Sequence, residues 1–87
     1  MYLINIVYSE GLYSGRESVP IVGNDREKVI EDAFAQYVFE SAAGLSENTD
    51  LNKAEFTKRM MLGFEDKNEF VLIQYPDSHI QFEPFVI

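Results

Sequence analysis

Residues 23–44 read GNDREKVIEDAFAQYVFESAAG, and this stretch decides the fold that the rest of the chain completes. Asn24 is a favourable N-cap, and Glu27 three positions later completes a capping-box pattern. Gly44 suits the position just after a helix. The stretch therefore predicts a helix over residues 25–43. Its apolar side chains share one broad stripe, which we expect to face a sheet: Val29, Ile30, Ala33, Phe34, Tyr37 and Val38.

Two β-strands are predicted before this helix. Residues 2–8, YLINIVY, alternate in character and are rich in β-branched and aromatic types. Residues 16–22, RESVPIV, form the second strand. Pro20 cannot donate to a strand ladder, so it places this strand at a sheet edge or at a bulge. The glycine-containing segment between the two runs predicts a hairpin.

A second helix is predicted over LNKAEFTKRMMLGF, residues 51–64. Thr49 or Asp50 is its expected N-cap. Its apolar side chains recur every four residues, at Phe56, Met60 and Phe64, so one face of this helix is also expected to pack on the sheet.

The last two predicted strands form another hairpin. FVLIQY, residues 70–75, is an apolar run that suits a central strand covered on both faces or a strand covered mainly on one. IQFEPFVI, residues 80–87, alternates and pairs back on it, with Pro84 at an edge or a bulge. The alternative for the final residues is a peptide that another protein captures by strand addition.

The order of elements is ββααββ. It predicts an α+β fold in which two helices pack on one face of a four-stranded antiparallel sheet. A chain of 87 residues has room for one core, so we expect a single domain over residues 1–87.

The charge balance points to the class of partner. Fifteen acidic residues stand against seven basic ones, for a net charge of −8. Such a surface repels nucleic acids and anionic membranes and attracts basic proteins, many of which bind nucleic acids. A negative charge also simply keeps a small protein soluble. There is no cysteine, no apolar run of about 18 residues and no basic leader, so a cytoplasmic protein is expected.

No motif in the chain predicts catalysis. His79 is the one histidine, and it follows Asp77 and Ser78 in sequence. Neighbouring residues in an extended segment point to opposite sides, so turn chemistry explains the set better than a catalytic triad. Residues 47–56 begin like a calcium loop, but lysine stands where that loop needs glycine. We therefore expect no enzymatic activity, no cofactor and no metal.

Two aromatic residues and a set of carboxylates are the candidate partner-binding residues. Phe39 lies off the core stripe of the first helix, where either the second helix or the following connection covers it, or it is an exposed anchor. Tyr13 is expected at the tip of the first hairpin, near carboxylates. The carboxylates are expected on outward helix faces and near the turns: Glu27, Glu31, Asp32, Glu40, Glu47, Glu65, Asp66 and Glu69.

By type, a short, acidic, cysteine-free chain resembles the inhibitors that phages and mobile elements use against host proteins, anti-CRISPR proteins among them. No shared motif supports this resemblance. It implies a viral, non-catalytic inhibitor in the host cytoplasm that acts as a nucleic-acid mimic and blocks the basic nucleic-acid-binding surface of a host effector. The alternative is a structural or adaptor subunit that forms a homodimer through its sheet edges or through Phe39.

Overall fold

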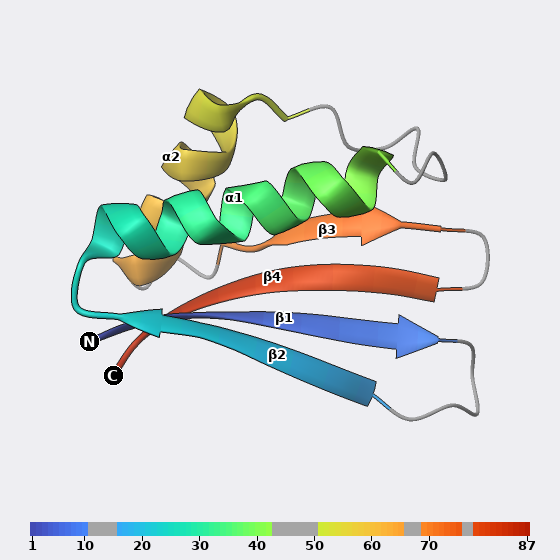
Figure 1. Cartoon of the computed structure of the whole chain (residues 1–87), viewed down its shortest axis with the longest axis horizontal. Coiled ribbons are helices and arrows are strands. Elements are labelled where there is room, and N and C mark those ends of the chain that lie inside the picture. The colour runs from blue at the N-terminus through green and yellow to red at the C-terminus, as the bar shows by residue number, and fades with distance from the viewer. Residues whose placement is uncertain (11–15, 43–50, 66–68, 76–77) are drawn as a thin grey trace.

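In a computed structural model, the chain forms four strands and two helices in the order ββααββ (Figure 1). The structure describes residues 1–10, 16–42, 51–65, 69–75 and 78–87. The strands pair in one antiparallel sheet of order β2-β1-β4-β3, which confirms the predicted fold class. The elements are β1 (Tyr2–Glu10), β2 (Arg16–Gly23), α1 (Arg26–Ala42), α2 (Lys53–Phe64), β3 (Val71–Gln74) and β4 (Ser78–Val86).

The first and last strands form the centre of the sheet. In the register, Ile4 of β1 lies opposite Ile21 of β2 on one side and opposite Pro84 of β4 on the other. Both chain ends lie at the same end of the sheet (Figure 1), where Ile87 N–H donates to the Met1 carbonyl over 2.8 Å. The prediction that the final residues form a strand is confirmed.

The third strand lies at an edge of the sheet. β3 pairs with β4 alone, so the central position considered for residues 70–75 is wrong. Its side chains alternate between buried and more exposed, with Val71 and Ile73 inward. The strand is therefore covered mainly on one face. Its continuous apolar sequence was compatible with coverage on one face or on both.

Both prolines sit where the ladder does not need their missing N–H. Pro20 lies in β2, an edge strand, as predicted. Pro84 lies in a central strand, but β3 stops opposite Phe82 and leaves only β1 beside it. Met1 and Ile87 exchange two backbone hydrogen bonds, so the backbone N–H and C=O groups of odd-numbered residues in β4 point toward β1. The nitrogen of Pro84 therefore points to the locally open side.

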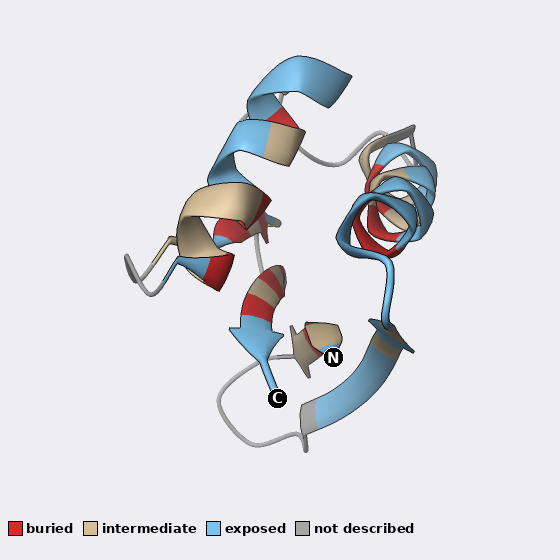
Figure 2. Cartoon of the chain, turned by 90° about the vertical axis from the view of Figure 1, so that its left-hand side faces the viewer, coloured by how far each residue is buried: buried red, intermediate tan, exposed pale blue. Residues whose placement is uncertain are grey.

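The core lies between the sheet and the two helices. Figure 2 shows both helices on one side of the sheet, with their buried residues turned toward it. Phe56 of α2 is the centre of this layer: its ring lies 5.1 Å from the Tyr37 ring of α1 and 5.7 Å from the Phe82 ring of β4. The remaining buried core residues are Ile4, Ile6, Val29, Ile30, Ala33, Met60, Phe64, Val71, Ile73 and Ile80.

The helix α1 begins one residue later than predicted. Asp25, and not Asn24, caps it, because the Asp25 Oδ1 accepts from the Glu27 N–H at 3.0 Å and from the Lys28 N–H at 3.4 Å. The capping box predicted for Asn24 and Glu27 is therefore wrong. Two adjacent residues can both cap, and the backbone path out of β2 selects the second.

The helix α2 begins two residues later than predicted, at Lys53. Its N-cap is Asn52, whose Oδ1 accepts from the Glu55 N–H over 2.8 Å. The caps predicted at Thr49 and Asp50, both outside the described residues, are therefore wrong. Asparagine caps as well as aspartate does, so the choice depends on where the chain turns into the helix.

A glycine sets how closely α2 approaches the sheet. Gly63 lies directly over the ring of Pro84, and a Cβ added to Gly63 would overlap that ring. The same Cβ would lie 2.9 Å from the Glu69 carbonyl oxygen. Glycine is normally unfavourable inside a helix, by about 1 kcal/mol relative to alanine. The close contact between helix and strand explains its presence here.

We predict that Gly63→Ala destabilises the protein, because relieving the overlap must displace α2 from β4. The free energy of unfolding, measured by urea titration, should fall by about 1–3 kcal/mol, as in other overpacked sites. In a Pro84→Ala background the same change should cost less, because the ring is gone. Stabilisation by Gly63→Ala, as its helix propensity alone would give, would contradict this account.

Candidate functional site

The outward surface of α1 carries the candidate site. Phe39 is 70% exposed, more than any other described aromatic residue, and Val38 beside it is 47% exposed. The interpretation in which the second helix covers Phe39 is therefore wrong, and the connection considered as the other cover, residues 43–50, lies outside the described residues. Val38 was expected in the core stripe, and that expectation is wrong too. Sequence periodicity could not exclude Val38 from the core stripe, because Val38 lies at the margin of that stripe and the width of the stripe depends on how α2 packs.

Three of the candidate carboxylates lie on the same surface, nearer the N-terminus of α1. Glu27, Glu31 and Asp32 are all exposed. Lys28 Nζ lies 3.1 Å from Asp32 Oδ1, one helical turn away. The hydrogen bond from Lys28 to Asp32, and then the charge of Asp32, raise the pKa of Lys28. This exposed pair is weak, so Asp32 can exchange its partner for another cation.

We call this surface the α1 outer face and define it by Glu27, Glu31, Asp32, Val38 and Phe39. It has an acidic half and an apolar half. Residues seven positions apart lie two turns apart on the same side of a helix, or about 10 Å. Glu31 and Val38 are so related, and so are Asp32 and Phe39. The face therefore fits a basic patch that lies about 10 Å from an apolar pocket.

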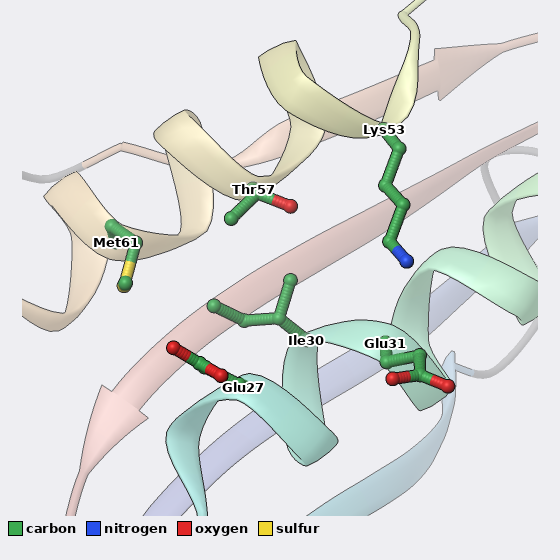
Figure 3. A pocket seen from close by; sticks show the side chains of 6 residues that line it. All are labelled: Glu27, Ile30, Glu31, Lys53, Thr57 and Met61. Carbon is green, nitrogen blue, oxygen red and sulfur yellow. The ribbon is translucent and has the colours of Figure 1, made fainter.

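A groove of about 240 Å³ runs between α1 and α2 beside this face (Figure 3). Glu27 and Glu31 border it from α1, and the Lys53 side chain extends toward α1 from the other helix. The floor is partly apolar. The remaining lining residues are Ile30, Thr57 and Met61. Because Lys53 offsets part of the acidic charge, the groove is less negative than the outer face.

The charge on the two helices has opposite sign. α2 carries three basic residues, Lys53, Lys58 and Arg59, and one acidic residue, Glu55. The acidic side chains of α1 therefore do not continue across the helical layer. A basic partner would be attracted to α1 and repelled by the exposed part of α2.

The other candidate residues do not join the α1 outer face. Glu65 is exposed just after α2, and Glu69 is half-buried before β3. Glu40 is half-buried and hydrogen-bonded within the fold. The candidates outside the described residues are Tyr13, Glu47 and Asp66. The structure therefore groups Glu27, Glu31 and Asp32 with Phe39. It adds Val38, which the sequence analysis missed, although its place next to Phe39 in the sequence could have indicated it.

Glu40 belongs to a polar cluster between α1 and the sheet. Its Oε1 accepts from Gln36 Nε2 at 2.8 Å and from the Tyr8 hydroxyl at 3.3 Å. The Tyr75 hydroxyl donates to the Glu40 carbonyl oxygen at 3.1 Å. Burial, and then the negative charge of Glu40, raise the pKa of both tyrosines. The cluster fastens the C-terminal half of α1 to β1 and to the end of β3.

Among residues 1–10, 16–42, 51–65, 69–75 and 78–87, no three potential metal ligands gather in one place. None of the helices in these ranges is long and apolar enough to cross a membrane. No protein-family model, curated protein or solved structure matches the chain.

We predict that alkaline pH weakens the fold through Tyr8 and Tyr75. Their pKa values are raised in the folded state, so the unfolded chain loses these protons first. The free energy of unfolding should stay level up to about pH 10 and fall as the pH rises through the raised values. Urea titrations between neutral and alkaline pH measure this fall.

Glu40→Gln separates charge from burial in this cluster. It removes the negative charge and should lower the pKa of Tyr8 toward the ordinary tyrosine value, because burial and the nearby Tyr75 still raise it but the charge of Glu40 does not. Titration of tyrosinate absorbance, with Tyr8→Phe to identify the signal, measures the shift. An unchanged Tyr8 titration would mean that Glu40 does not face the ring in solution.

Proposed function

We propose that the protein is a non-catalytic binding protein, and that the α1 outer face docks on a basic surface of another protein. The observation that carries this proposal is Phe39, an aromatic side chain 70% exposed on a helix that the core holds rigidly. Exposed aromatic side chains on rigid elements are typical anchors of protein interfaces, where a few residues supply most of the binding energy.

The geometry of the face describes the partner. Phe39 and Val38 require an apolar pocket, and the carboxylates on the preceding turns require arginine or lysine about 10 Å away from it. Opposite charge would steer the two proteins together, and burial of the phenylalanine would slow their separation. Because α2 is basic, the contact is confined to α1 and to its side of the groove.

Basic surface patches are typical of proteins that bind nucleic acids. A protein seated there would exclude the nucleic acid, with Glu31 and Asp32 in place of phosphates. This mode of action is that of a small acidic inhibitor, such as those made by phages and mobile elements. The mimicry rests on few carboxylates, so the aromatic anchor supplies the larger part of the affinity.

We predict that Phe39→Ala strongly weakens partner binding and leaves the fold intact. Truncation of a central aromatic anchor weakens binding by about 2 kcal/mol or more, which is at least about 30-fold. The exposed ring adds little to folding, so the free energy of unfolding should change by less than about 0.5 kcal/mol. Capture of proteins from a cell lysate on the immobilised chain, followed by titration of the purified partner, measures the effect.

A double charge reversal, Glu31→Lys with Asp32→Lys, tests the electrostatic half of the face. It should reduce the association rate and remove its dependence on salt. Glu17→Lys, an exposed carboxylate on β2, is the matched control and should bind as the wild type does. Nucleic acid should compete with the wild-type chain for the partner. If the chain still binds after Phe39→Ala and after the double reversal of Glu31 and Asp32, the proposed site is refuted. If nucleic acid does not compete for the partner, the inhibitory mode is refuted.

A further inference from the structure

The sheet has a second surface on the side away from the helices, on which Val7 is buried near the middle and the end near Met1 and Ile87 is exposed. Both helices lie on one side of the sheet (Figure 2). Side chains alternate along each strand, so every second residue points to the other side. We call this side the open sheet face. On β1 and β4 it carries Leu3 and Phe85, which the register places opposite each other.

One end of the open sheet face is apolar. Val22, Leu3 and Phe85 form one row across β2, β1 and β4, and the first and last of these are about half exposed. The next row holds Met1 and Ile87, which bond to each other and are also exposed. These five residues make a contiguous apolar patch, of the kind that marks an interaction site on small proteins.

The described side chains of this face carry little charge, and the Met1 ammonium group lies at its end. Among its described side chains Glu83 is the single carboxylate, and none is lysine or arginine. The whole chain carries a net charge of −8, so most of that charge lies elsewhere. A basic partner has no electrostatic reason to choose this face, whereas a second copy of the same chain meets little repulsion over it.

We propose that the open sheet face is a homodimer interface, in which two copies pack sheet against sheet. Packed sheets lie about 10 Å apart, and each helical layer lies about 10 Å beyond its own sheet. The two acidic α1 helices would then be about 30 Å apart, several times the Debye length of about 8 Å at physiological salt. The acidic α1 helices therefore do not oppose this arrangement, as they would oppose packing through α1.

The size of the face is close to what a dimer needs. The two central strands have nine residues each, which at about 3.3 Å per residue gives about 30 Å of length. Four strands about 4.8 Å apart give a width of about 19 Å. Because β2 has eight residues and β3 only four, the face is smaller than this rectangle, and two such faces would bury about 950 Å² in total, close to the lower bound for a specific interface. Buried area alone does not set the affinity, so the test below spans a wide range of concentrations around micromolar.

The sheet edges are poorer candidates for self-association. Pro20 lies in the middle of β2 with its nitrogen on the outer side, and β3 has only four residues. The homodimer through the open sheet face is independent of the proposed function. It leaves each α1 outer face free, on opposite sides of the assembly, so a dimer could engage two partner sites at once.

The test is the mass of the purified chain in solution. Sedimentation equilibrium from about 1 to about 500 µM, a range that brackets micromolar dissociation constants, should show a rise from the chain mass of 10.0 kDa to twice that value. The double variant Val22→Lys with Phe85→Lys should remain at the chain mass, because it places like charges against each other across the interface. Phe39→Lys, the matched control on α1, should associate as the wild type does.

Two results would overturn the proposal. One is a wild-type chain that stays at the monomer mass throughout this range, which would leave the face to a different protein. The other is a double variant, shown by circular dichroism to be folded, that associates like the wild type. If the lysine variant does not fold, Val22→Thr with Phe85→Thr replaces it, because threonine favours strands; it should weaken association at least tenfold.

Discussion

The contact of Phe56 with Tyr37 and Phe82 holds the molecule together. The three rings come from α2, α1 and β4, and each is fully or almost fully buried. Neither helix can bury its apolar face without this shared layer, and the strand that carries Phe82 pairs with both β1 and β3. Removal of the Phe56 ring would leave a cavity where α1, α2 and β4 meet, and such cavities cost several kcal/mol. The position of every surface discussed above follows from this junction.

A core built on one side of the sheet leaves two kinds of surface. Phe34, Phe56, Phe64 and Phe82 fill or border the interior, whereas Phe39, Phe70 and Phe85 lie at least two-fifths exposed. Phe39 is next to carboxylates, and Phe85 lies on a face nearly without charge. This difference in electrostatic surroundings is why we assign a basic protein to the first surface and a second copy of the chain to the other. Both assignments use exposed aromatic side chains that the fold itself does not require.

The sequence was sufficient for the order of elements and for most of the core. Alternation in residues 2–8 and the helical spacing of Phe56, Met60 and Phe64 each have one stable interpretation, and the structure confirms both. The sequence was insufficient where two neighbours are equivalent locally, as Asn24 and Asp25 are as caps. It was also insufficient at Val38, on the margin of the core stripe, and it could not decide whether Phe39, off that stripe, is covered, because both depend on the path of α2. The grouping of Glu31 and Asp32 with Phe39 follows from helical geometry, while the inward position of Glu40 depends on contacts with β1.

The most direct test of this account is the solvent accessibility of the seven phenylalanine rings in solution. The chain would be labelled with fluorinated phenylalanine, each resonance assigned by a single Phe→Leu variant, and a soluble paramagnetic agent added. The account predicts strong broadening of Phe39 at every protein concentration, none of Phe56 and Phe82, and broadening of Phe85 that disappears as the protein is concentrated. Protection of Phe39 in the isolated chain would contradict the proposed binding face, and a Phe85 signal that is insensitive to concentration would contradict the proposed dimer.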